Sequence, residues 1–112
     1  MSSSVTARNG RASATAGAAT WISVHTSDPG VTGAGEVATA PYARKQTVWG
    51  APSAGAILGS QVSVDVPSGG PYTHYGIWSA SSAGIFYEGG LLSTAETFGG
   101  VGILRITPTL QA

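Results

Sequence analysis

The stretch Thr-Trp-Ile-Ser-Val-His-Thr-Ser-Asp-Pro-Gly at residues 20–30 decides the fold class, because a strand pattern runs directly into a turn signal. Apolar and polar side chains alternate over residues 20–25, and many are β-branched or aromatic, which indicates a strand with one buried face. Pro29 presets the φ of the second turn position, and Gly30 accepts the positive φ of the third, as a type II turn requires. The stretch therefore predicts a β-strand followed by a chain reversal.

The rest of the chain continues this pattern. The period of two recurs at residues 61–66 and 102–107. Aromatic and β-branched runs, each bounded by Gly, Pro or Ser clusters, lie at 43–49, 72–79 and 84–92. Further breaks are expected at 67–71, 79–84 and 98–100. Six or more short strands at this spacing predict an all-β fold, specifically a small β-sandwich or jelly-roll-like domain.

The chain length predicts one domain with an N-terminal extension. A chain of 112 residues has room for a single modest core. Residues 1–18 are expected to form an arm or a short helix, in which Gly10 and Gly17 each cost about 1 kcal/mol relative to Ala. Residues 19–112 are expected to form the β-sandwich. The polar, Gly-rich residues 26–42 fit either an ordered excursion over the surface or a flexible arm.

The composition indicates a surface that other protein covers. Gly, Ala, Ser and Thr make up 60 of the 112 residues, and charged residues make up 9% against about 25% in ordinary soluble domains. Five basic and five acidic residues give a net charge of zero, which favours association. Nine aromatic rings are many for a small core, and aromatic residues are enriched at interface hot spots. We therefore expect the chain to bind copies of itself, as a trimer.

Several classes of function are disfavoured by what the sequence lacks. It contains no Cys, so disulfides, thiolate zinc sites and cysteine nucleophiles are excluded. No basic run exceeds two residues and no stretch of about 20 residues is apolar, so neither nucleic acid nor a membrane is an expected partner. The N-terminus has no basic-then-apolar order of a secretion signal, which favours synthesis in the cytosol.

The residue types that carry catalysis or bind metals are also scarce. His25 and Asp28 lie three residues apart, but the chain has only two His, and Asp28 is expected to lead the turn by accepting backbone N–H groups. Glu88 and Glu96 flank the Gly-Gly-Leu-Leu run at 89–92, which we expect to be a turn, and a solvated or ion-paired role is expected for both. We expect no enzyme activity, no catalytic, cofactor-binding or metal-binding residue, and no cofactor.

A family resemblance covers residues 19–107. Its motifs are the run at 20–30, Gly-Ala-Gly-Glu-Val at 33–37, Pro-Tyr-Ala-Arg at 41–44, Trp-Gly-Ala-Pro at 49–52, Val-Pro-Ser-Gly-Gly at 66–70 and His-Tyr-Gly-Ile-Trp-Ser-Ala at 74–80. In these motifs the chain resembles a family of small structural proteins from the tail or virion modules of tailed bacteriophages, usually described as tail fibre or minor tail proteins. The resemblance implies a virion component, assembled in the host cytoplasm, that joins other virion proteins and catalyses no reaction.

Three functional hypotheses follow. The first is a tail-associated structural protein that self-associates and docks on the particle. The second is a capsid decoration protein that reinforces the phage head. The third is a module that binds a host receptor or glycan, because His74 and Trp78 share one strand face and a ring can stack on a sugar. Residues at that face more often fill a core or a subunit interface. The candidates for interface or ligand contacts are Trp21, Tyr42, Trp49, His74 and Trp78.

Overall fold

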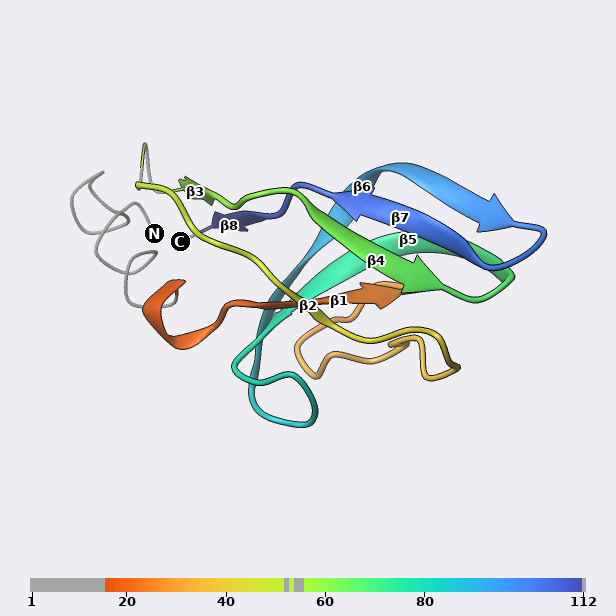
Figure 1. Cartoon of the computed structure of the whole chain (residues 1–112). Coiled ribbons are helices and arrows are strands. Elements are labelled where there is room, and N and C mark those ends of the chain that lie inside the picture. Colours follow the sequence, from red (N-terminus) through yellow and green to blue (C-terminus); the bar gives the residue numbers. More distant parts are fainter. Residues whose placement is uncertain (1–15, 52, 54–55, 112) are drawn as a thin grey trace.

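A computed structural model describes residues 16–51, 53 and 56–111 of the chain (Figure 1). Residues 16–18 form one helical turn, and the rest of the predicted arm or helix at 1–18 lies outside the described residues. Eight strands follow: β1 (Trp21–His25), β2 (Lys45–Gln46), β3 (Ala56–Leu58), β4 (Val62–Val66), β5 (Gly69–Trp78), β6 (Phe86–Phe98), β7 (Gly102–Ile106) and β8 (Thr109–Gln111). The predicted all-β fold is confirmed.

The strands form three antiparallel sheets. A four-stranded sheet has the order β2-β1-β5-β6, and two ribbons consist of β4 with β7 and of β3 with β8. In the large sheet Trp21 lies opposite Trp78 and His25 lies opposite His74. In the β4–β7 ribbon Val64 lies opposite Leu104. Figure 1 shows the ribbon of β4 and β7 lying across β5 and β6, so the molecule has two layers.

Two short connections create this layering. Residues 67–68 join β4 to β5, and residues 99–101 join β6 to β7, yet neither pair of consecutive strands is hydrogen-bonded to each other. Antiparallel strands joined by two or three residues usually form a hairpin. Here each connection instead carries the chain from one layer to the other, which sets two strand pairs face to face. The core therefore lies between the layers.

Apolar side chains of both layers fill this core. Ile22 and Val24 of β1 and Val64 of β4 are fully buried, and Leu104 of β7 meets them from the same layer as Val64. Burying a side chain of this size contributes roughly 1.5–3 kcal/mol. The expectation that the strand at 20–25 buries only one face is wrong, because Ser23 and His25 on the opposite face are also fully buried. Gly33 and Arg44, which contact Trp78, and Ala34, which contacts His25, cover part of that second face.

Residues 26–42 form an ordered segment over the surface, the first of the two alternatives expected from the sequence, and not a flexible arm. Gly30 N donates to Asp28 Oδ1 at 2.9 Å and Gly30 has a φ of +61°, so Asp28 leads the turn as expected. Gly33 N donates to the Pro29 carbonyl at 3.0 Å. Val37 N then donates to the Val24 carbonyl at 3.0 Å, which returns the segment to the edge of β1. The excursion is thus tied to the sheet at both of its ends.

Two strand predictions need correction in extent. The run at 43–49 contributes only Lys45–Gln46 to the sheet, together with an isolated bridge between Trp49 and Gly59. The Gly-Gly-Leu-Leu run at 89–92 is not a turn, since it lies inside the thirteen-residue β6. A Cβ on Gly90 would come within 2.7 Å of the Tyr75 ring, so this glycine allows close packing within the sheet and does not reverse the chain.

Candidate interaction site

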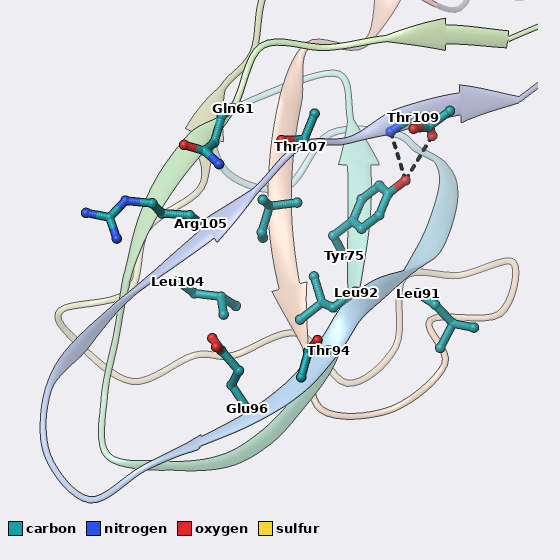
Figure 2. A pocket seen from close by; sticks show the side chains of 11 residues that line it. Gln61, Tyr75, Leu91, Leu92, Thr94, Glu96, Leu104, Arg105, Thr107 and Thr109 are labelled. Carbon is teal, nitrogen blue, oxygen red and sulfur yellow. Dashed lines mark hydrogen bonds between the residues drawn. The ribbon is translucent and has the colours of Figure 1, made fainter.

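A groove of about 390 Å³ runs between β6 and β7 (Figure 2). Leu92 of β6 and Leu104 and Ile106 of β7 supply its apolar part, and the last two belong to the core. Polar and charged side chains line the rest: Gln61, Thr94, Glu96, Arg105, Thr107 and Thr109. The groove therefore gives access to the core from the side of the sandwich, between polar walls.

The strand order explains why the groove is open. β6 is the last strand of the four-stranded sheet, and among the described strands β7 pairs only with β4. Both strands thus turn a backbone edge without a strand partner toward the groove. At the other side of the sandwich β2 approaches β4, which narrows that seam. Open strand edges are templates for the addition of a further strand.

Tyr75 lines one end of this groove and bonds to the backbone of Thr109 there. Its hydroxyl donates to the Thr109 carbonyl and accepts from Thr109 N, both at 2.9 Å, as the dashed lines in Figure 2 show. Burial raises the pKa of the Tyr75 hydroxyl, so it stays protonated and keeps the donor role. This double contact joins β5 to the start of β8 and closes the layers behind the groove.

The ring of Trp78 is enclosed by contacts within the chain. The guanidinium of Arg44 lies 3.8 Å from the ring centroid, and the Phe86 ring meets Trp78 edge-on at 5.2 Å. A Cβ on Gly33 would come within 2.4 Å of the Trp78 ring, so the 26–42 segment packs directly on it. The side chain is accordingly buried, with 9% exposed.

A chain of hydrogen bonds continues from Trp78 into β1. The indole N–H of Trp78 donates to Ser23 Oγ at 2.8 Å, and Ser23 Oγ lies 2.6 Å from His25 Nε2. His25 Nδ1 lies 2.7 Å from the Ala34 carbonyl, which can only accept, so Nδ1 carries the proton and Ser23 donates to Nε2. Burial lowers the pKa of His25, with the Ala34 contact opposing that shift in part, and the ring is neutral.

A second polar cluster, formed by Glu36, Tyr42 and Arg44, holds the C-terminal part of the 26–42 segment. Arg44 binds Glu36 through two parallel bonds, Nε to Oε2 and Nη2 to Oε1, both 2.8 Å. Tyr42 donates to Glu36 Oε2 at 2.6 Å, and Arg44 Nη1 also donates to the carbonyls of Ala80 and Ala83. Burial by itself raises the pKa of Glu36, but the hydrogen bonds from Arg44 and Tyr42 outweigh it and hold that pKa below its usual value.

The chemistry open to these clusters is limited by burial. Ser23 and His25 have the spacing of a nucleophile and a base, but both are fully buried and the base is oriented by a carbonyl and not by a carboxylate. Within the described ranges, no group of three or more His, Cys, Asp or Glu is placed to hold a metal ion. No helix among the described residues is long and apolar enough to cross a membrane.

The five candidate residues lie in different surroundings. Trp78 and Tyr42 take part in the two clusters just described, on either side of Arg44. Trp49 is half-buried and its indole donates to the Ala19 carbonyl at 2.8 Å, while Trp21 is half-buried in β1. His74 is half-buried, with Nδ1 at 2.7 Å from Thr73 Oγ1. The interface or ligand role of all five stays a prediction.

The groove residues were missed by the sequence reasoning. Nothing in the local pattern distinguishes Leu92 or Leu104 from other apolar strand residues, and the short connection at 99–101 indicates a hairpin that would have no groove. The Arg44–Glu36 pair was also missed. The sequence feature that could have indicated this pair is the motif Gly-Ala-Gly-Glu-Val followed by Pro-Tyr-Ala-Arg. It places Glu36 and Arg44, two of the few charged residues, close to Tyr42 in the sequence.

Together, the strand order, the open groove and the buried polar clusters define a small all-β domain of two layers. The family model described as podophage GP4 fiber I protein gp80 matches residues 5–109, and the chain belongs to this family. It is therefore a tail-associated structural protein of a bacteriophage and a component of the virion, as the resemblance implies. No curated protein and no solved structure matches the chain.

Proposed function

We propose that this protein is a structural subunit of the phage tail that self-associates, as a trimer, and docks on other virion proteins without catalysing a reaction. The observation that supports the proposal most directly is the groove between two open strand edges, with core residues at its floor and polar walls. Such edges are normally blocked by charge, a covering element or a partner. Here the described residues place no element over the groove, and each edge carries one charge at the groove, Glu96 on β6 and Arg105 on β7, of opposite sign.

Exposed apolar side chains support the same proposal. Eight large ones are exposed in the described part of the chain: Val31, Val48, Leu58, Ile85, Tyr87, Leu91, Val101 and Ile103. Val48 and Leu58 lie on the two segments joined by the bridge between Trp49 and Gly59. Single exposed apolar residues are ordinary on a protein surface, but two on adjacent bridged segments form a patch suited to burial.

The absence of catalysis is supported by the place of the Ser23–His25 pair. A nucleophile must reach its substrate, and these two side chains are enclosed by Trp78, the 26–42 segment and β5. The pair satisfies buried hydrogen-bonding groups, which is sufficient reason for its geometry.

Two other roles stay predictions. A capsid decoration protein would use the same apolar surfaces on the phage head. A receptor- or glycan-binding module would need Trp78 as a stacking platform, and in this structure Arg44, Phe86 and Gly33 already contact that ring. The fibre family favours the tail.

The experiment that tests the proposal combines two measurements. Light scattering of the purified protein is expected to give a mass of three times 11.1 kDa. Cryo-electron microscopy of intact particles is expected to place the subunit on the tail. Density at the capsid axes alone would favour decoration. A monomer that is also absent from particles would overturn the proposal.

A further inference from the structure

We infer that residues 27–35 form a flap that stays closed over Trp78 while His25 is neutral and opens when that histidine takes up a second proton. The inference goes beyond the proposed function and does not depend on it. The flap is the orange loop that follows β1 in Figure 1. Three features support the inference: a hydrogen-bond chain with no place for a further proton, surroundings that disfavour another cation, and a segment that is bonded within itself.

The hydrogen-bond chain beneath the flap is complete when His25 is neutral. It begins at the indole of Trp78, which can only donate, and ends at the carbonyl of Ala34, which can only accept. Between these ends, Ser23 Oγ accepts from the indole and donates to His25 Nε2, which is 2.6 Å away. His25 Nδ1 then donates to Ala34 at 2.7 Å. Each link in the chain therefore already has its one proton.

A proton added at His25 Nε2 breaks this arrangement. The new N–H and the Ser23 O–H would point at each other across 2.6 Å, so Ser23 must turn its proton away from the ring. Both side chains are fully buried, and a Cβ on Gly76 would come within 2.8 Å of His25 Nε2, so β5 leaves no room for water there. A buried hydroxyl without an acceptor and a buried cation are both unfavourable.

The charges near His25 do not offset an added cation. Four charged or titratable groups face this histidine or lie on the flap: Arg44, His74, Glu36 and Asp28. Arg44 and His74 oppose a positive charge, and His74 lies directly opposite on β5. The Glu36 carboxylate already accepts two bonds from Arg44, and Asp28 accepts from the backbone within the turn. Hydration is the remaining way to stabilise the charge.

The flap can move as a unit because it is bonded within itself. Gly33 N and Ala34 N both donate to the Pro29 carbonyl, at 3.0 and 3.1 Å, and Thr26 N donates to the Gly35 carbonyl at its base. Of its nine residues, all but Pro29 and Gly33 are exposed. Segments with few buried residues and mostly local bonds are those that open without unfolding the rest of a domain.

Packing contacts and a hydrogen bond keep the flap closed. Pro29 packs on β6, Gly33 packs on the Trp78 ring, and Ala34 accepts from His25. The bond to Ala34 survives protonation, so opening is driven by hydration of the imidazolium and by removal of the conflict at Ser23. Burial lowers the pKa of His25 in the closed form, and the open form therefore binds the proton more readily. Opening uncovers the Trp78 ring.

Hydrogen exchange of the full-length protein, followed by NMR at several low urea concentrations, tests the inference. The probes are the indole N–H of Trp78, which lies under the flap, and the backbone N–H of Thr26, which bonds at its base. Their protection factors compare the exchange rate of the unfolded chain with that of the folded one at the same pH. We expect these factors to fall about tenfold between pH 7 and 5.

The amides that pair β4 with β7 report on opening of the whole domain. We expect them to be at least tenfold better protected than the flap probes and to exchange faster as urea is added. Exchange at the flap probes is expected to be insensitive to urea. The indole N–H of Trp49, which donates to the Ala19 carbonyl away from the flap, is the matched probe, and its protection is expected to change less than twofold with pH.

His25→Gln separates this histidine from the other groups. A Gln side chain has both a donor and an acceptor but does not titrate, so we expect the flap probes to lose their pH dependence. His74→Gln is the control and is expected to keep the dependence. If His25→Gln does not fold, the His74→Gln result decides, because the chain contains two histidines.

Three results would overturn the inference. Exchange at Trp78 that depends on urea as the β4–β7 amides do would mean that the domain opens as a whole. Protection that is constant between pH 7 and 5, or that falls equally at Trp49, would show that no flap responds to His25. A pH dependence that His25→Gln retains, or that His74→Gln loses, would belong to another group.

Discussion

The guanidinium of Arg44 lies 3.8 Å from the centroid of the Trp78 ring and joins three segments of the chain. From that position it also binds Glu36 and the carbonyls of Ala80 and Ala83. The Arg44 side chain thus connects the 26–42 segment through Glu36, β5 through Trp78, and the loop after β5 through the two carbonyls. In a small domain with few charges, this residue is a main determinant of how these segments pack.

Removal of Arg44 is expected to destabilise the domain strongly. Arg44→Ala leaves Glu36 half-buried without its cation and two carbonyls without a donor, and loss of one partner of a buried pair typically costs about 3–5 kcal/mol. We expect about 3 kcal/mol, measured as the free energy of unfolding in urea. Lys45→Ala is the neighbouring control and is expected to stay within about 0.5 kcal/mol. Equal losses in both variants would contradict this account.

The stability of the domain is expected to fall as the pH drops below about 6.5. Because burial lowers the pKa of His25, the unfolded chain binds a proton at that residue more readily than the folded one. The contribution of neutral His25 is therefore complete above its unfolded pKa of 6.5 and is lost below it. The slope reaches at most about 1.4 kcal/mol per pH unit for one group.

Unfolding in urea between pH 8 and 5 measures this effect. The range stays above the titration of Glu36, whose pKa is lowered from 4.5. His25→Gln is expected to flatten the curve, and His74→Gln is expected to retain it. If His74→Gln flattened the curve instead, the pH dependence would come from His74, and the prediction for His25 would be contradicted.

A methyl group at Gly33 is expected to disturb the packing on Trp78. Gly33→Ala combines a positive φ of 79° with a Cβ 2.4 Å from the ring, so we expect a loss of at least 3 kcal/mol. Gly30→Ala has a similar φ of 61° with nothing within 4 Å, and its expected cost of about 1 kcal/mol reports the backbone alone. Thermal unfolding compares the two. Similar costs would mean that the contact with Trp78 does not matter.

The exposed apolar patch is expected to affect assembly and not folding. The double variant Val48→Lys with Leu58→Lys is expected to weaken self-association at least tenfold, because charges resist burial at an interface. Its free energy of unfolding in the monomer is expected to change by about 0.5 kcal/mol or less. Val31→Lys, at a turn tip with 91% exposure, is the control and is expected to assemble normally. Normal assembly of the double variant would exclude this patch from the interface.

Much of the fold was predictable from local pattern. The alternation at 61–66 and 102–107 placed β4 and β7 to within one residue, because period-two burial is a property of the strand itself. The turn at Asp28 to Gly30 was predictable because its geometry depends on adjacent residues. The length of β6 was not, since its glycines serve contacts with Pro29 and Tyr75 from elsewhere in the chain.

The amino-acid sequence by itself determined the strand-forming segments, the turn after β1 and a surface poor in charge, because each depends on residue type and on near neighbours. Only the tertiary structure decided which strand edges stay open and which distant groups meet. Ser23 and Trp78 are 55 positions apart and become hydrogen-bonded only because β1 pairs with β5. The groove exists because β6 and β7 lie in different layers and do not pair with each other. This arrangement depends on the packing of all eight strands and not on the three residues that join these two.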